Sequence, residues 1–177
     1  MSTPPRIHIV GRKNAGKTTL VCTLIQELTQ CGLKVASVKH THHHHELDTP
    51  GKDSHRHRIS GAVATGILSP HMTALFIPDA REQRADDRYA AFEQAFASSD
   101  VILVEGDLHT SGTRIEVWRP ELSEPPYAFA DPGIHAVISD AALTNLTCPC
   151  WPASPVSRLV SLFLELLPQN PAKGTVG

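Results

Sequence analysis

The segment with the strongest chemical meaning in this chain is residues 11–18. It reads Gly-Arg-Lys-Asn-Ala-Gly-Lys-Thr, which fits the phosphate-loop (P-loop) pattern GxxxxGKT. In such a loop the small residues let successive backbone N–H groups point inward, and the N-terminus of the following helix adds a partial positive charge. We expect Lys17 to bridge the β and γ phosphates of a nucleotide and Thr18 to place its hydroxyl on Mg²⁺. The segment therefore predicts a nucleotide phosphate site.

A P-loop usually works with an acidic residue at the end of a neighbouring strand, and Glu105 fits that role. It directly follows four aliphatic residues, 101–104, in a run typical of a buried strand. Its carboxylate would hold Mg²⁺ together with the Thr18 hydroxyl. An acid after an apolar strand is common by itself, so it is the presence of the P-loop that favours the functional interpretation.

Few residues could recognise the nucleotide base. The guanine-reading motif NKxD is absent from the sequence, and residues 48–51 match DxxG only after histidines instead of a hydrophobic strand. We interpret that match as accidental. Asp140 follows the apolar residues 136–138 and could accept hydrogen bonds from N1 and the exocyclic amine of guanine. The same aspartate could instead cap a helix.

Histidines cluster in one polar segment: seven of the 11 lie between His40 and His57, four of them at 42–45. Imidazole binds Zn²⁺, Ni²⁺ and Cu²⁺, and its pKa of about 6.5 also suits a proton shuttle. The alternative is a solvated loop without a specific role, which we favour for histidines 43–45.

A second anion site is conceivable just after the histidine run. Lys52, Asp53 and Ser54 join a cation to two capping residues at a predicted helix start, and Arg56 and Arg58 follow on that helix. An ordinary capped helix with surface arginines explains the same pattern equally well.

The elements that must position these residues alternate between strands and helices. We predict strands at 7–10, 34–38, 64–68, 73–77, 101–104 and 136–138, and helices at 17–31, from Asp53 or Ser54 onward, at 87–97 and at 156–167. This order favours an α/β fold of the P-loop NTPase type, with a mostly parallel sheet and helices on both faces. The expected organisation is one nucleotide-binding domain over 1–168 with a flexible tail at 169–177.

A small β excursion at 113–132 is expected to lie outside this pattern. Residues 114–118 alternate like an extra strand, and the proline-rich stretch after them reads as a surface segment. Ile115, Val117 and Trp118 in it would suit a dimer interface.

Composition limits the class of protein. The 177 residues are 41% hydrophobic and 19% charged, with a net charge of −2, which argues against a nucleic-acid partner. The longest apolar stretches are shorter than the roughly 20 residues that span a bilayer, and the first residues lack the apolar core of a secretory signal. We expect a cytoplasmic protein with no membrane partner and with its four cysteines reduced.

Four motifs together resemble the MobB family of molybdopterin-guanine dinucleotide biosynthesis adaptor proteins. They are VGRKNAGKTTL at 10–20, VKHTHH at 38–43, PGKDS at 50–54 and ILVEG at 102–106, and they cover most of positions 7–140. The second and third are more particular to the family than the P-loop. The resemblance implies a fold similar to P-loop GTPases, a homodimer, GTP binding with slow hydrolysis, and assistance to a MobA-like enzyme that attaches GMP to the molybdenum cofactor.

The resemblance also implies roles for individual residues. These are nucleotide contacts from Gly11, Asn14, Ala15, Gly16, Lys17, Thr18, Thr19 and Asp140, Mg²⁺ near Thr18 and Glu105, and a cofactor or anion site, with molybdopterin as candidate ligand, at His40, Lys52, Asp53 and Ser54. One departure is that family members often continue VEG with Phe-Lys, whereas this chain has Asp107 and Leu108. The missing lysine removes the basis for an anion contact there.

The leading hypothesis is thus a GTP-binding adaptor that is at most a weak GTPase. In the sequence no residue clearly positions an attacking water and no internal arginine finger is identifiable, a group worth about 10³ to 10⁵ in rate. One alternative is a metal-delivery GTPase, similar to nickel chaperones, that uses the histidine-rich loop. Another is a small-molecule kinase in which Asp53 or His40 activates a hydroxyl.

Overall fold

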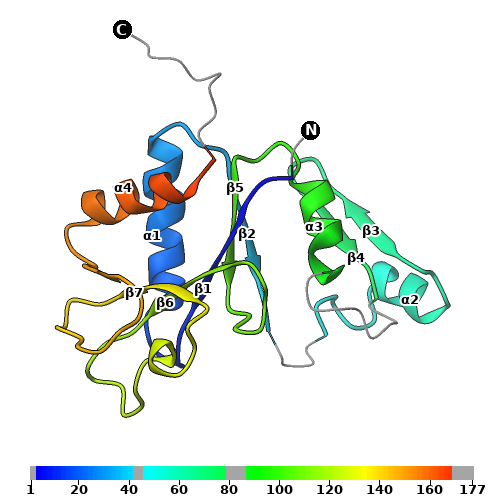
Figure 1. Ribbon diagram of the computed structural model, residues 1–177. Helices are drawn as coiled ribbons and strands as arrows, with labels where there is room; N and C mark the ends of the chain where they lie inside the picture. Colours follow the sequence, from blue (N-terminus) through cyan, green and yellow to red (C-terminus); the bar gives the residue numbers. More distant parts are fainter. Residues whose placement is uncertain (1–2, 42–45, 79–86, 169–177) are drawn as a thin grey trace, which may run out of the picture. The chain divides into compact units, whose positions relative to one another are not determined.

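The fold is described by a computed structural model, which covers residues 3–41, 46–78 and 87–168 (Figure 1). The chain forms two compact units: a large unit of Met1–Thr41 with Arg84–Gly177, and a small unit of His42–Gln83. A single domain over 1–168 stays a prediction, and we describe each unit by itself. Histidines 42–45 and the predicted tail at 169–177 lie outside the described residues.

The large unit is built on a six-stranded sheet in the order β2-β5-β1-β6-β7-β8. The strands are β1 (Arg6–Val10), β2 (Val35–Lys39), β5 (Val101–Glu105), β6 (Thr113–Val117), β7 (Ile134–Ile138) and β8 (Cys150–Trp151). Every neighbouring pair runs parallel. The predicted parallel sheet is therefore confirmed.

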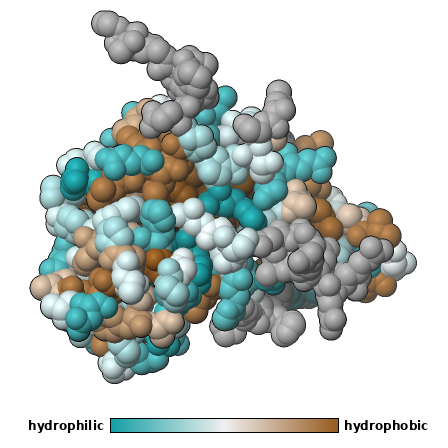
Figure 2. Space-filling view, in the orientation of Figure 1, coloured by the Kyte–Doolittle hydropathy of each residue, from teal (hydrophilic) through white to brown (hydrophobic). Residues whose placement is uncertain are grey.

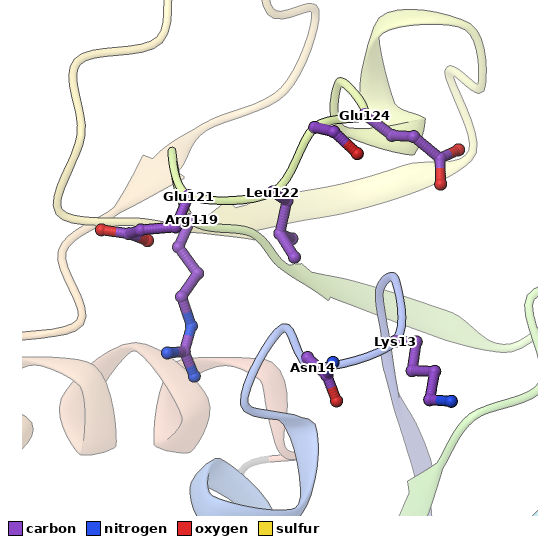
Figure 3. Close-up of a pocket in the computed structure, with 7 residues that line it drawn as sticks. Lys13, Asn14, Arg119, Glu121, Leu122 and Glu124 are labelled. Carbon is purple, nitrogen blue, oxygen red and sulfur yellow. The ribbon is translucent and has the colours of Figure 1, made fainter.

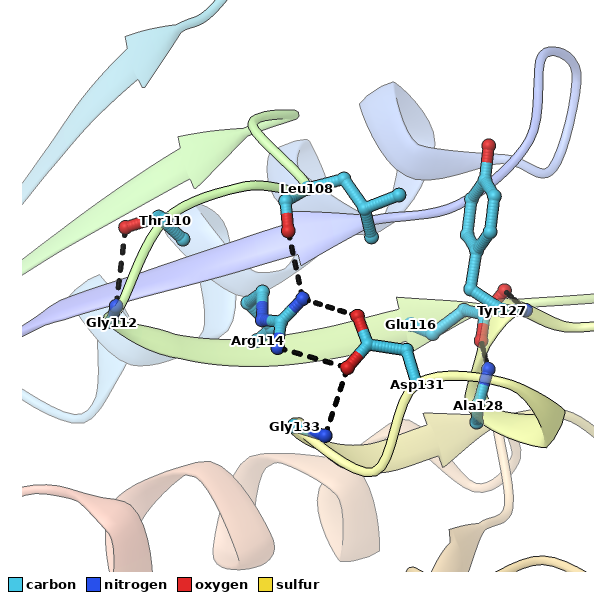
Figure 4. Close-up of polar contacts among 9 residues, drawn as sticks. All are labelled: Leu108, Thr110, Gly112, Arg114, Glu116, Tyr127, Ala128, Asp131 and Gly133. Carbon is cyan, nitrogen blue, oxygen red and sulfur yellow. Dashed lines mark hydrogen bonds and ion pairs between the residues drawn. The ribbon is translucent and has the colours of Figure 1, made fainter. Parts of the chain in front are cut away.

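Strand β6 corrects the prediction of a β excursion at 113–132. It lies inside the main sheet, between β1 and β7, and Ile115 and Val117 are buried in the core instead of lying free for an interface. The polar residues that alternate with them also have partners within the fold. Arg114 forms an ion pair with Asp131, and Glu116 accepts backbone hydrogen bonds (Figure 4). The polar alternation therefore does not mark a solvent-exposed strand.

Helices cover both faces of this sheet, as predicted. Strand β1 shows the division, because Ile7 and Ile9 join one core cluster and Val10 joins another. Helices α1 (Lys17–Gln30) and α4 (Val156–Leu166) pack on the Ile7 face, and Figure 1 shows them side by side. The other face carries η1 (Asp87–Tyr89), α3 (Ala90–Ala95) and η2 (Tyr127–Phe129). No helix in the described ranges is long and apolar enough to cross a membrane.

The small unit contains helix α2 (Asp53–Ile59) and an antiparallel pair, β3 (Thr65–Leu68) and β4 (Thr73–Phe76). The residue that caps α2 is Lys52, one position before the predicted Asp53 or Ser54. Many large apolar side chains of this unit are at least two-fifths exposed, and Figure 2 shows apolar residues at its surface. They are Leu47, Ile59, Val63, Ile67, Leu68, Met72, Leu75 and Ile77.

Candidate nucleotide-binding site

The carboxyl ends of the parallel strands gather the predicted site residues at one edge of the large unit. Strand register pairs Ile9 with Glu105 and Val10 with Glu116, and pairs Val117 with Ile138. The loops that follow β1, β5, β6 and β7 therefore leave the sheet at the same level. In open parallel sheets this edge is where ligands bind.

The P-loop turns sharply between β1 and α1, and its glycines adopt backbone angles that other residues rarely take. Gly11 and Gly16 have φ angles of +144° and +98°, and Asn14 is left-handed at +64°. A Cβ on Gly11 would collide with the carbonyl oxygen of Val117, and one on Gly16 would collide with the guanidinium of Arg119. Backbone packing thus excludes a side chain at Gly11, whereas at Gly16 the positive φ is the constraint, because the guanidinium is the end of a flexible side chain.

Lys17 places its ammonium across the P-loop. Nζ donates hydrogen bonds to the carbonyl oxygens of Gly11 at 2.9 Å and Arg12 at 2.7 Å. Burial lowers the pKa of Lys17, while the nearby Glu105 carboxylate opposes that shift and Lys39 adds to it. A partly desolvated cation held in this position is stabilised by any anion that enters the loop.

The predicted Mg²⁺ pair meets in the structure. Thr18 Oγ1 donates a hydrogen bond to Glu105 Oε1 at 2.7 Å, and Lys39 Nζ lies 3.9 Å from the same oxygen. Hydroxyl and carboxylate oxygens are ligands that Mg²⁺ accepts, alongside water and phosphate oxygens. These two residues therefore fit the chemistry of a nucleotide-bound Mg²⁺.

A cavity of about 580 Å³ connects the P-loop with the end of β7. Its lining includes Ala15, Gly16 and Thr19 from the loop and α1, together with residues 117–121, which begin at the last residue of β6, and 138–141, which begin at the last residue of β7. The volume lies within the range of about 300–1,000 Å³ that is typical of small-molecule sites. The predicted residues Thr19 and Asp140, distant in sequence, thus line one cavity.

Asp140 is held in a defined orientation at the wall of this cavity. Its Oδ1 accepts hydrogen bonds from the backbone N–H groups of Ala153 at 2.8 Å and Ser154 at 3.2 Å. The alternative of a helix cap is wrong, because no helix begins there and the next one in the described chain is α4. The carboxylate therefore lies at the cavity wall instead of at a helix end.

Arg119 is a further candidate site residue, which the sequence motifs did not indicate. It follows β6, its Nε donates a hydrogen bond to the Ala15 carbonyl oxygen at 3.0 Å, and Figure 3 shows it reaching from the strand end toward the P-loop. It lines the 580 Å³ cavity and a second one of about 410 Å³ that also includes Lys13 and Asn14. The available signal was its place directly after a candidate strand, which in a parallel sheet puts it at the P-loop edge.

The segment after β6 also braces the P-loop from outside. Arg12 Nη1 lies 2.6 Å from Glu124 Oε2, and the Arg12 guanidinium lies 3.9 Å from the centre of the Tyr127 ring. Trp118 Nε1 donates a hydrogen bond to the Glu124 carbonyl oxygen at 2.9 Å. These contacts give Arg12 a structural role in holding the loop.

Residues of the predicted anion site have other partners in the structure. His40 lies in the large unit, where its backbone N–H donates a hydrogen bond to the Glu105 carbonyl oxygen at 2.9 Å. In the small unit Lys52 and Asp53 are exposed, and the Ser54 hydroxyl donates a hydrogen bond to the buried Asp48 at 2.8 Å. The anion site that the sequence suggests at these residues stays a prediction.

Asp107, at the departure from the family pattern, has a structural role. It is buried, and its Oδ2 accepts a hydrogen bond from the Tyr89 hydroxyl at 2.7 Å. Burial is the main cause that raises the pKa of Tyr89, and the Asp107 carboxylate adds to it. This contact fastens η1 beside the end of β5.

Metal binding by the histidine run stays a prediction, and histidines 42–45 lie outside the described residues. Elsewhere in the described ranges, no group of three or more His, Cys, Asp or Glu side chains is gathered in a way that could hold a metal ion.

Comparisons with known proteins agree on one family. Residues 6–140 match the family model of MobB, "Molybdopterin guanine dinucleotide synthesis protein B". The chain is 32% identical over 162 residues to the molybdopterin-guanine dinucleotide biosynthesis adapter protein of Escherichia coli K12, covering 91% of this chain and 92% of that protein. The Haemophilus influenzae protein of the same name is 30% identical over 121 residues, 68% of this chain and 67% of the relative.

Solved structures show the same fold. A crystal structure of molybdopterin-guanine biosynthesis protein B is 28% identical, has a TM-score of 0.67 and covers 91% of this chain and 97% of that one. A MobB homologue from Bacillus stearothermophilus is 24% identical with a TM-score of 0.64, covering 90% of this chain and 95% of that one. With its parallel sheet, P-loop and match over most of its length, the chain belongs to the MobB family.

Proposed function

We propose that this chain binds GTP and Mg²⁺ at the carboxyl edge of its large sheet. The observation that carries the proposal is the 580 Å³ cavity, which begins at the P-loop and reaches Asp140. Triphosphate oxygens would contact Lys17 and the loop N–H groups, and Thr18 with Glu105 would hold Mg²⁺. Asp140 would accept hydrogen bonds from N1 and the exocyclic amine of guanine, which adenine does not offer in this arrangement.

The family places this binding protein in molybdopterin guanine dinucleotide synthesis. We propose an adaptor role in which the GTP-bound chain assists a MobA-like enzyme that attaches GMP to the cofactor. Molybdopterin is the proposed ligand of the residues His40, Lys52, Asp53 and Ser54. A cytoplasmic location fits such a partner.

Turnover in this proposal is slow. The Lys17 ammonium and the loop N–H groups bind phosphate charge, which favours the bound nucleotide. Rapid hydrolysis additionally requires a group that orients the attacking water. We therefore assign the chain a binding role with weak GTPase activity, which a partner could stimulate.

Isothermal titration calorimetry with GTP and ATP, with and without Mg²⁺, tests the proposal. The unsubstituted protein should bind GTP more tightly than ATP, and Mg²⁺ should strengthen both. Lys17→Ala removes the ammonium that spans the loop and should weaken both nucleotides by at least about tenfold, because an ionic phosphate contact is lost.

The matched control is Lys34→Ala, since Lys34 is an exposed lysine just before β2, at the opposite end of that strand from Lys39. This variant should bind as the unsubstituted protein does. Equal losses in both variants, or no GTP binding by the unsubstituted chain, would contradict the proposed site.

A further inference from the structure

Arg119 occupies a position that the P-loop chemistry does not explain. It borders both cavities at this edge of the sheet, and its side chain is exposed. Its Nε–H is bonded to the Ala15 carbonyl oxygen at 3.0 Å, and its Nη2 group lies against Gly16. These two contacts fix the guanidinium beside the loop while it still lines the larger cavity (Figure 3).

The other two cations with contacts at the P-loop have different partners. Lys17 extends across the loop to the carbonyl oxygens of Gly11 and Arg12. Arg12 is engaged by Glu124 and by the ring of Tyr127, outside the larger cavity. Arg119 is therefore the guanidinium that lines the cavity leading to Asp140.

We infer that Arg119 is a positioning residue for the nucleotide base, and that its guanidinium plane forms the surface on which the flat ring stacks. A guanidinium stacks on aromatic faces through dispersion and cation–π attraction, which an ammonium cannot match. The bond to Ala15 holds its orientation in advance, so little side-chain entropy is lost on binding. Asp140, on the wall of the same cavity, would then accept hydrogen bonds from the edge of the stacked ring.

This inference rests on the proposed nucleotide site and makes a separate claim about it. A residue that stacks on the base contributes to the affinity for the base and not to the affinity for the phosphates. Inorganic triphosphate, which has no base, is therefore the probe that separates the two. Lys17 should matter to GTP and to triphosphate alike, whereas Arg119 should matter to GTP alone.

Calorimetric titration of GTP and of inorganic triphosphate, both with Mg²⁺, provides the test. Arg119→Ala should weaken GTP binding roughly tenfold and leave the triphosphate affinity within about twofold, in line with the stacking energies known for bases. Arg119→Tyr retains a flat surface without the charge, and it should recover most of the GTP affinity. Arg158→Ala, an exposed arginine on α4, is the control and should change neither.

Each outcome of this titration supports or contradicts the stacking role. If Arg119→Ala weakens triphosphate as much as GTP, Arg119 contacts phosphate and the stacking role is wrong. If Arg119→Ala binds GTP as the unsubstituted protein does, Arg119 has no role in binding. If the unsubstituted protein binds neither probe, the nucleotide site itself is wrong, and this inference fails with it. Circular dichroism of each variant confirms that the fold is retained.

Discussion

The charged side chains at the carboxyl edge of the large sheet differ in the groups to which they hydrogen-bond. Lys17 donates to loop carbonyls, Glu105 accepts from the Thr18 hydroxyl, and Asp140 accepts from two backbone N–H groups. In the proposed site each group would have a different ligand: phosphate for the Lys17 ammonium, Mg²⁺ for the Thr18 hydroxyl and the Glu105 carboxylate, and a hydrogen-bond donor of the base for Asp140. Substitutions at single positions should reveal these preferences one at a time.

Asp140→Asn should change which base is bound while leaving the fold intact. The Asn side-chain carbonyl can still accept from Ala153 and Ser154, but its amide donates where the carboxylate accepted. Guanine presents donors at this edge, whereas xanthine presents a carbonyl oxygen in place of the exocyclic amine. We expect GTP affinity to fall about tenfold or more and xanthosine triphosphate to become the better ligand. Competition titrations measure this reversal, and an unchanged preference would remove Asp140 from base recognition.

Glu105→Gln should uncouple Mg²⁺ from nucleotide binding. The amide oxygen preserves the hydrogen bond from the Thr18 hydroxyl, so the loop geometry should persist, but the negative charge that attracts the cation is lost. The protein should still bind GTP without Mg²⁺, and adding Mg²⁺ should improve the affinity much less than in the unsubstituted chain. Titrations over a series of Mg²⁺ concentrations show the difference; an identical Mg²⁺ dependence in both proteins would exclude this metal role.

At the scale of elements, the segment that follows β6 depends on one buried carboxylate. Glu116 is fully buried and accepts hydrogen bonds from the N–H groups of Tyr127 at 2.8 Å and Ala128 at 2.9 Å (Figure 4). It thereby ties β6 to η2, between which lie Arg119 and the brace formed by Glu124. Strand β6 thus positions site residues through an interaction on the face away from α1 and α4.

This carboxylate makes a prediction about pH. Burial raises the pKa of Glu116, and the two N–H bonds oppose that shift without cancelling it. The folded state therefore binds this proton more tightly than the unfolded chain does. The contribution of Glu116 to the free energy of unfolding is present below about pH 4.5 and is lost as pH rises through the raised pKa. A glutamine at this position does not titrate. The free energy of unfolding of the Glu116→Gln variant, relative to that of the unsubstituted protein, should therefore increase as pH rises through that window.

Urea unfolding at several pH values between about 4 and 8 measures the difference between the two proteins, which cancels the other titrating groups. Asp131 is one of these groups. The hydrogen bond from the Arg114 guanidinium is the main cause that lowers the pKa of Asp131, so the contribution of Asp131 to the free energy of unfolding changes with pH in the opposite direction. Glu121→Gln, which makes the same change at an exposed position, is the control. Parallel curves for Glu116→Gln would contradict the buried titration.

At the scale of the whole molecule, the two units differ in how many of their large apolar side chains are buried. The large unit buries most of its large aliphatic and aromatic residues in three core clusters. The small unit exposes many of its own, among them Leu68 at 85% and Leu75 at 64%. So many exposed large apolar side chains in one small unit favour a binding surface. We propose that a second copy of the chain covers it, in agreement with the homodimer that the family resemblance implies.

The double variant Leu68→Ser and Leu75→Ser should shift the protein from dimer to monomer. Both side chains lie on the β3–β4 pair, and removing their apolar area reduces the free energy of association. Sedimentation velocity measures the molecular mass in solution. Phe129→Ser, which changes an exposed apolar residue of the large unit, should leave the mass unchanged. A native monomer, or a dimer that survives the double change, would exclude this interface.

The sequence alone was sufficient for the P-loop, the strands around it and the pairing of Thr18 with Glu105. The P-loop depends on contiguous residues, since a glycine pattern between an apolar strand and a helix determines its own turn. The pairing of Thr18 with Glu105 joins residues far apart in the sequence, and it could be expected because neighbouring parallel strands end at the same edge of the sheet. Only the tertiary structure showed that β6 belongs to the main sheet, that Asp107 holds Tyr89 and that Arg119 reaches Ala15. These results depend on which distant segments pair, and a polar residue such as Glu116 looks the same in sequence whether water or buried backbone N–H groups satisfy it.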